Sequence, residues 1–225
     1  MVNDKLIPIL IICRDRLECL KKLIAALEER GCKNIILIDN ASTYTPLLEY
    51  YKTLPHKVVR NRENYGHTVI TREDIIGPYK NSWYAYTDPD VIPIAECPAD
   101  FITRFRELLE RHPQVNKVGF GLKIDDLPNH YRYKPNVVEW ETQFWSNQIE
   151  PGVYGAPIDT TFCLVRPGTV PYYTDGGKVI CSVGALRTGS PYIARHYAWY
   201  TDSNNIPEDE KYYRAYATSS ASHGV

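Results

Sequence analysis

Short aliphatic runs alternate with amphipathic segments through the first 90 residues, and this alternation restricts the fold more than any other feature of the sequence. The longest run, Leu6–Cys13, is apolar almost throughout, which is typical of a strand buried on both faces of a parallel sheet. Further short runs at Ile35–Ile38, Lys57–Arg60 and Trp83–Thr87 are separated by segments whose apolar residues have helical spacing. We therefore predict three βα units and an α/β domain with a mostly parallel central sheet.

Composition narrows the class of protein. The chain has 225 residues and a formal net charge of −1, so no overall basic field exists to attract nucleic acid. The six cysteines are scattered without a C-x-x-C pair, which favours a reduced, cytoplasmic protein over a disulfide scaffold. The Leu6–Cys13 run contains a proline and is far too short to span a bilayer, so we expect no transmembrane segment.

The second half of the chain has a less regular pattern, and we predict one domain over residues 1–218 with a flexible tail over 219–225. The predicted elements here are a helix around Phe101–Leu109, a strand at Lys117–Leu122, a long loop at Asp125–Asn136, an aromatic helix at Val137–Trp145, a strand at Thr160–Val165 and a last helix at Glu208–Tyr216. In the aromatic helix we expect Trp140, Phe144 and Trp145 to face the core.

Asp88-Pro89-Asp90 follows the last strand of the first half. Pro89 lacks a backbone donor and pushes Asp88 toward an extended conformation, so the strand stops there and leaves two carboxylates at its carboxyl end. Ligands of open α/β sheets collect outside this end of the strands, and two carboxylates suit a divalent cation that also holds phosphate. For an isolated Asp-Pro-Asp, a polar turn that closes a strand is the commoner explanation.

Three blocks of the second half, Glu139–Trp145, Ile158–Phe162 and Tyr192–His196, resemble those of small stand-alone GT-A enzymes in bacterial and viral polysaccharide systems. Four segments of the first half, in order, resemble the GT-A glycosyltransferases, most closely the family 2 type. They are Cys13–Arg16, Ile38–Ser42, Asn64–Gly66 and Asp88–Asp90. The resemblance covers roughly the first 115 residues, with Asp88–Asp90 where the family has its DxD motif. It implies a Rossmann-like three-layer α/β/α fold, with a nucleotide-binding half at 1–115 and an acceptor-side half at 116–218.

The resemblance also implies an activity: transfer of a sugar from a nucleotide diphosphate sugar, UDP-sugar favoured, to a glycan or glycolipid acceptor, with inversion and with Mn²⁺ or Mg²⁺ as cofactor. It leaves open that the chain belongs to a larger multi-enzyme chain. The residues implied for nucleotide binding are Arg14, Asp39, Asn64, Gly66, Asp88 and Arg195. The residues implied for the metal are Asp90, Asp88 and His196. Without the resemblance, Asp39 would be interpreted as an Asx turn after a strand, and His196 equally well as a packed histidine.

The catalytic base is less clearly indicated, because the second half has no Gly-Gly-Phe-Asp followed by a Glu-Asp pair. Inverting transfer needs a carboxylate that takes the acceptor hydroxyl's proton. Asp159 is the first candidate, since it precedes a predicted strand in the acceptor-side half. Glu141 is the second candidate, although it equally fits the solvated face of the aromatic helix.

Two other functions compete with this hypothesis. The first is a GT-A module that binds a nucleotide sugar but lacks a working base. The second is a phosphatase of the haloacid dehalogenase type, for which Asp125-Asp126 and Lys123 would match a later acidic pair. The phosphatase fails on order, because its Asp-x-Asp belongs after the first strand, whereas three βα units precede Asp88.

Overall fold

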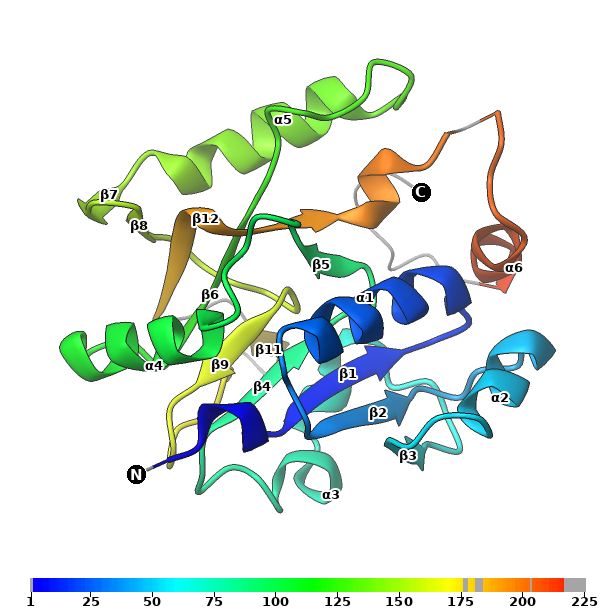
Figure 1. Ribbon diagram of the computed structural model, residues 1–225, viewed down its shortest axis with the longest axis horizontal. Helices are drawn as coiled ribbons and strands as arrows, with labels where there is room; N and C mark the ends of the chain where they lie inside the picture. Colours follow the sequence, from blue (N-terminus) through cyan, green and yellow to red (C-terminus); the bar gives the residue numbers. More distant parts are fainter. Residues whose placement is uncertain (1, 176–177, 181–183, 203, 217–225) are drawn as a thin grey trace.

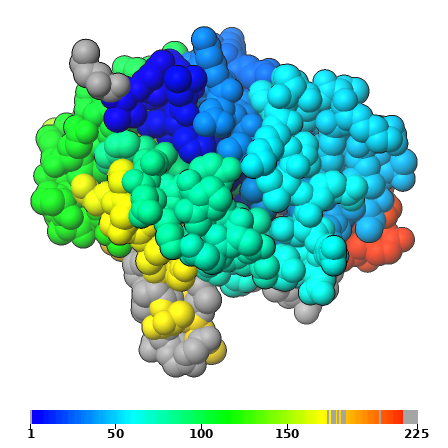
Figure 2. All heavy atoms as spheres, turned by 90° about the horizontal axis from the view of Figure 1, so that it is seen from below, coloured from blue at the N-terminus to red at the C-terminus, as the bar shows by residue number. Residues whose placement is uncertain are grey.

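The computed structural model describes residues 2–175, 178–180, 184–202 and 204–216, and it confirms the predicted fold class. A ten-stranded sheet forms the centre (Figure 1). In spatial order its strands are β3 (Lys57–Arg60), β2 (Ile35–Asp39), β1 (Ile9–Cys13), β4 (Tyr84–Thr87), β9 (Cys163–Val165), β6 (Lys117–Leu122), β12 (Ala185–His196), β8 (Val153–Gly155) and β7 (Gln148–Glu150), with β5 (Val91–Pro93) paired to β12. The hairpin of β10 (Tyr173–Asp175) and β11 (Lys178–Ile180) forms a separate sheet and protrudes from the body of the molecule in Figure 2.

Most strands of the large sheet point the same way. β3, β2, β1 and β4 are mutually parallel, as the three βα units predicted. β9 is antiparallel to both β4 and β6, and β6 is parallel to β12. Therefore β6 and β12 run in the same direction as β1 to β4, and β9 runs in the opposite direction. The carboxyl ends of β1, β2 and β4 therefore lie at one edge of the sheet, where the polar residues of the sequence were expected to gather.

Helices cover both faces of this sheet, which makes a Rossmann-like three-layer architecture of the GT-A type. The helices are α1 (Leu17–Glu29), α2 (Thr45–Tyr51), α3 (Glu73–Ile76), α4 (Phe101–Arg111), α5 (Lys134–Thr142) and α6 (Glu208–Tyr216), with 3₁₀ turns at Asp4–Leu6, Gly66–Thr71, Gln143–Trp145 and Tyr197–Tyr200. Alternate residues of β1 enter two different apolar clusters: Ile9 and Ile11 pack with α1 and α4, whereas Leu10 and Ile12 pack with α3. This division follows from the period of two in a strand.

The aromatic segment differs from its prediction. Trp140 does not face the core, since half of its surface is exposed, whereas Glu141 is buried. The reason is that Val137 and Glu141, four residues apart on α5, form the buried face of this helix, so that Trp140 points to a different side. Trp145 then packs where Gly121 has no side chain, because a Cβ there would lie 2.6 Å from the Trp145 ring.

Several element boundaries also differ. The first strand begins at Ile9, after a 3₁₀ turn. The segment with helical spacing before Trp83 contains a 3₁₀ turn at Gly66–Thr71 and the four residues of α3. The last helix, Glu208–Tyr216, is confirmed with the predicted ends. The predicted tail at 219–225 lies outside the described residues. Within the described part of the chain, no helix combines the length and apolar character needed to cross a membrane.

Gly119 on β6 permits the close approach of β9, and we predict that Gly119→Ala destabilises the protein. A Cβ at this position would lie 2.1 Å from the Phe162 carbonyl oxygen, which cannot move without breaking the β6–β9 pairing. We expect a loss of about 1–3 kcal/mol in the free energy of unfolding, measured by urea denaturation. Gly155→Ala is the control, because its Cβ meets the end of the flexible Asn147 side chain. An equal loss in both variants would contradict this explanation.

Candidate functional site

The Asp-Pro-Asp segment connects β4 to β5 at the carboxyl edge of the sheet. β5 pairs antiparallel with the end of β12, with Val91 opposite His196. This pairing brings His196 to Asp90, with Nε2 3.7 Å from Oδ2 of the carboxylate. The structure thus places together two of the three residues that the sequence assigned to a metal, from segments more than 100 residues apart.

Asp90 is 1% exposed, although it follows a strand end and was expected outside the core. Its Oδ2 accepts a hydrogen bond from Arg16 Nη1 at 2.7 Å, while its Oδ1 is buried without a hydrogen-bond partner among the described residues. Burial raises the pKa of the Asp90 carboxyl, but His196 and Arg16 outweigh burial, so that this pKa lies below its ordinary value. Asp90 is therefore a buried carboxylate with one free oxygen.

Asp88 has the opposite electrostatic environment. Its Oδ2 accepts a hydrogen bond from Thr160 Oγ1 at 2.5 Å, and its backbone N–H donates to the Thr160 carbonyl. Burial, followed by the negative charge of Asp90, raises the pKa of Asp88 to about 8. Two neighbouring buried carboxylates cannot both ionise at low cost, so the pair holds a proton at neutral pH until a cation compensates its charge.

This difference predicts a pH-dependent effect of Asp88→Asn on the protein without metal. The folded pKa of Asp88 is raised from 3.8 to about 8, so its contribution to stability is complete below the unfolded pKa and is lost as pH rises through the folded pKa. In the presence of a chelator, the melting temperature of Asp88→Asn should therefore increase relative to that of the wild type as the pH rises from about 4 to about 8.

The control for this experiment is Asp125→Asn, which alters an exposed carboxylate that contacts only Lys123 in its ion pair. Its melting temperature should follow the wild type across the same range. A constant difference between Asp88→Asn and the wild type at all pH values would contradict the raised pKa of Asp88.

The residues at this edge fit a divalent cation in part. The free Oδ1 of Asp90 is a hard, buried acceptor, and Asp88 and His196 lie beside it. Among the described residues, however, no group of three or more His, Cys, Asp or Glu side chains is arranged to hold a metal by itself. The chain can thus supply only part of a coordination sphere, and the remaining ligands would be phosphate oxygens and water.

The loops after β1 and β2 are joined by Asp15, which the sequence analysis did not single out. Its Oδ1 accepts from the backbone N–H groups of Thr43 and Tyr44 at 2.7 and 2.8 Å, and its own N–H donates to Ser42 Oγ. Asp15 and Ala41 both have positive φ, 53° and 60°. Strained backbone of this kind persists where surrounding contacts impose it, and it clusters at functional sites.

Asn64 and Gly66 lie next to the end of β2 and are joined to it through Asn40. Asn40 Nδ2 donates to Asn64 Oδ1 at 2.8 Å, and Asn40 Oδ1 accepts from the N–H of Tyr65 at 2.9 Å. Gly66 has a φ of 59°, a conformation that favours glycine, and its N–H also donates to Asn64 Oδ1. These contacts hold two of the predicted nucleotide-binding loops side by side.

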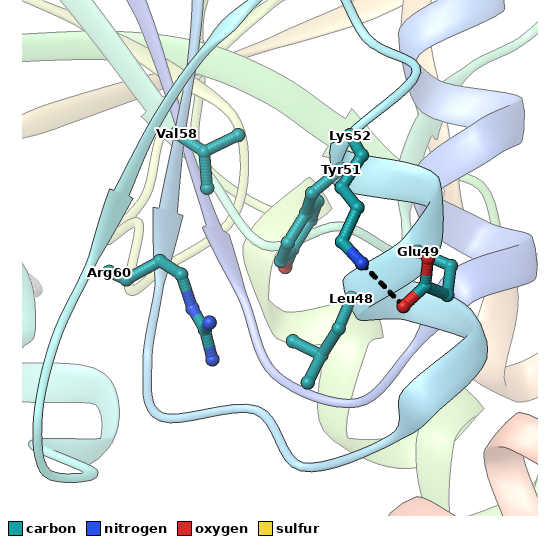
Figure 3. A pocket seen from close by; sticks show the side chains of 6 residues that line it. All are labelled: Leu48, Glu49, Tyr51, Lys52, Val58 and Arg60. Carbon is teal, nitrogen blue, oxygen red and sulfur yellow. Dashed lines mark hydrogen bonds and ion pairs between the residues drawn. The ribbon is translucent and has the colours of Figure 1, made fainter.

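Asp39 is fully buried at the end of β2 and both of its carboxylate oxygens have partners. Tyr51 donates to Oδ1 at 3.1 Å and Arg60 Nε donates to Oδ2 at 3.2 Å. Figure 3 shows Tyr51 from α2 facing Arg60 and Val58 from β3 across a cleft of about 370 Å³. Arg60 is half-exposed, so a nucleobase that reached Asp39 would replace this contact or approach over it.

The two arginines predicted for the nucleotide have different surroundings. Arg14 lies next to Asp15 and donates to the carbonyl of Tyr216 at the end of α6. Arg195 is paired with Asp126 and contacts Tyr200, and it points away from its neighbour His196, as successive residues of a strand do. The arginine that contacts the carboxylate pair is Arg16, which no local pattern distinguishes from Arg14.

Of the two candidate bases, only Asp159 is accessible. Asp159 is exposed, and its backbone carbonyl accepts from the Tyr86 hydroxyl at 3.0 Å, just before the Thr160 that contacts Asp88. Glu141 is 4% exposed and forms an ion pair of 2.8 Å with the buried Arg187. Asp159 therefore lies next to the Asp-Pro-Asp segment, whereas Glu141 is buried against Arg187.

Comparison with known proteins adds little to this description. No family model and no curated protein matches the chain. Among solved structures it is similar to S. aureus TarS 1–349, alone and in complex with UDP, at 14% and 13% identity and TM-scores of 0.39 and 0.38, covering 52% of this chain and 36% of that chain. A UDP-glucose pyrophosphorylase complexed with UDP-glucose is 13% identical, with a TM-score of 0.35 and coverage of 81% and 76%.

The chain thus spans about a third of the TarS 1–349 structures that it matches. Because these TM-scores are low, the fold assignment rests on the strand order and directions of the sheet.

Proposed function

We propose that this chain is a metal-dependent glycosyltransferase of the GT-A type, similar to family 2. It would move a sugar from a nucleotide diphosphate sugar, with UDP-sugar favoured, to a glycan or glycolipid acceptor with inversion. The observation that carries the proposal is the buried Asp90 carboxylate, whose free Oδ1 lies at the carboxyl edge of the sheet. A carboxylate oxygen that has lost water without gaining a partner is costly, and a bound cation would remove that cost.

The neighbouring loops support a nucleotide diphosphate as the ligand. The loops after β1 and β2 and the loop that contains Asn64 and Gly66 are joined by side-chain hydrogen bonds next to the acidic pair. In open α/β sheets this edge is the usual place of a nucleotide. Arg16 adds a positive charge beside Asp90.

In the proposed reaction, Asp90 and Asp88 would hold the metal and the diphosphate, with His196 as a further ligand from β12. Bound Mn²⁺ or Mg²⁺ would act as a Lewis acid that stabilises the leaving diphosphate. Thr160 keeps Asp88 oriented by its hydrogen bond.

We assign the base to Asp159 in preference to Glu141. A general base needs an accessible carboxylate within reach of the acceptor hydroxyl, and Asp159 is exposed beside the Asp-Pro-Asp segment. Glu141 would first have to leave its buried partner Arg187, and an ion pair broken in a buried site costs several kcal/mol, about 3–5. The competing function is a nucleotide-sugar-binding module without a working base.

Donor binding is tested by a thermal-shift panel of nucleotide sugars, with and without Mn²⁺. At about 100 times the dissociation constant, a ligand of the folded state should raise the melting temperature by about 5–10 °C. Asp90→Asn should remove the Mn²⁺-dependent part of the shift given by UDP, while Asp125→Asn, a change of an exposed carboxylate, should retain it. An unchanged Mn²⁺-dependent shift in Asp90→Asn would rule out the metal role of Asp90.

The base is tested by Asp159→Asn and Asp159→Ala. Both should bind UDP and Mn²⁺ like the wild type, because Asp159 contributes only its backbone carbonyl to the contacts described above. Transfer and slow donor hydrolysis should fall by about 10²–10⁴-fold. If hydrolysis is unchanged in Asp159→Ala and also in Glu141→Ala, the binding-module hypothesis is favoured over the transferase.

A further inference from the structure

The Arg16 side chain bridges two carboxylates from distant parts of the chain. Its Nη1 donates to Asp90 Oδ2 at 2.7 Å, and its Nε and Nη2 donate to the two carboxylate oxygens of Glu210 at 2.9 and 3.3 Å. The guanidinium carbon also lies 4.0 Å from the ring centroid of Tyr213. The bidentate contact and the ring both come from α6, so the C-terminal helix holds the guanidinium more firmly than Asp90 does.

α6 is docked beside the start of α1, as Figure 1 shows. Asp209 accepts a hydrogen bond from the N–H of Glu18 in the first turn of α1, and the ring of Tyr212 lies 5.0 Å from that of Tyr44. These contacts do not involve Arg16, so docking of the helix and retention of the guanidinium rest on different side chains. Glu210 is 6% exposed. Its burial next to the Arg16–Asp90 pair removes water from a second carboxylate, and this desolvation costs free energy.

We propose that Glu210 is a positioning residue of the donor site, and that it acts through Arg16 on the metal ligand Asp90. This inference rests on the proposed function. Because Arg16 holds Oδ2 of Asp90, the carboxylate keeps the orientation in which Oδ1 is free for the cation. Outer partners of this kind fix the geometry of a metal ligand and affect its affinity. The site is therefore completed by the C-terminal helix.

The negative charge of Glu210 should favour cation binding, as its positioning of Arg16 does. An unbalanced guanidinium next to Asp90 would repel a divalent cation, and Glu210 compensates that charge at hydrogen-bond distance. Replacing Glu210 by a neutral residue should remove the bidentate partner that keeps the Arg16 guanidinium in place, and it should raise the local positive charge. Both effects should weaken cation binding.

The test is the Mn²⁺ affinity of Glu210→Gln at a fixed UDP concentration. It is measured as the Mn²⁺ concentration that gives half of the UDP-dependent thermal shift, and independently from the electron paramagnetic resonance signal of free Mn²⁺. We expect affinity to fall by about 10-fold or more, within the range of about 10–100-fold known for outer partners of metal ligands. Two variants on α6 serve as matched controls. Arg214→Met removes the ion pair between Arg214 and Glu210, and Glu208→Gln changes an exposed residue of the same helix.

A second variant separates positioning from a general role in folding. Arg16→Lys retains a positive charge but loses the planar fork that bridges Asp90 and Glu210. It should weaken Mn²⁺ binding like Glu210→Gln, and the two changes together should weaken it little further, because they act on one connection. Additive losses in the double variant would overturn the inference.

The outcomes distinguish this inference from the proposed function. If Asp90→Asn loses Mn²⁺-dependent binding while Glu210→Gln binds Mn²⁺ like the wild type and the two controls, the positioning role is wrong and the proposed function stands. Equal losses in Glu210→Gln, Arg214→Met and Glu208→Gln would show that α6 acts only through its own stability, which also overturns the inference. Wild-type protein without Mn²⁺-dependent UDP binding would overturn both.

Discussion

The ion pair between Asp90 and Arg16 is the interaction on which the candidate site depends. Two carboxylates one residue apart, at a buried edge of a sheet, repel each other and lose their hydration. Arg16 compensates the charge of Asp90, whereas burial and the charge of Asp90 raise the pKa of Asp88. In a solvent-exposed polar turn, water would screen the two carboxylates, and no compensating arginine would be needed.

The Arg16 side chain also connects three distant segments of the chain. Arg16 follows β1, Asp90 precedes β5, and Glu210 lies on the last described helix, so one guanidinium joins three segments around the carboxyl edge of the sheet. The pairing of β5 with β12 adds His196 to this group. The strand pairing and the Arg16 side chain together assemble the candidate site.

The first half of the fold could be predicted because its signals are local. Aliphatic runs, helical spacing and the proline in Asp-Pro-Asp act within a few residues, and the parallel direction of β1, β2, β3 and β4 follows from three βα units. In the aromatic helix the prediction was wrong for Trp140, whereas Trp145 packs against the core. Glu141 takes the buried face because it pairs with Arg187, and no local spacing shows that long-range ion pair.

The sequence alone therefore determined the α/β class, the strand end at which Asp88 and Asp90 lie, and the turn that places them at one edge of the sheet, since these depend on neighbouring residues. Only the tertiary structure decided that Arg16 contacts Asp90 across 74 residues, and that Glu210 holds Arg16 across 194. The physical reason is that such contacts depend on which helices dock at the sheet edge, and docking is decided by shape and charge over the whole chain.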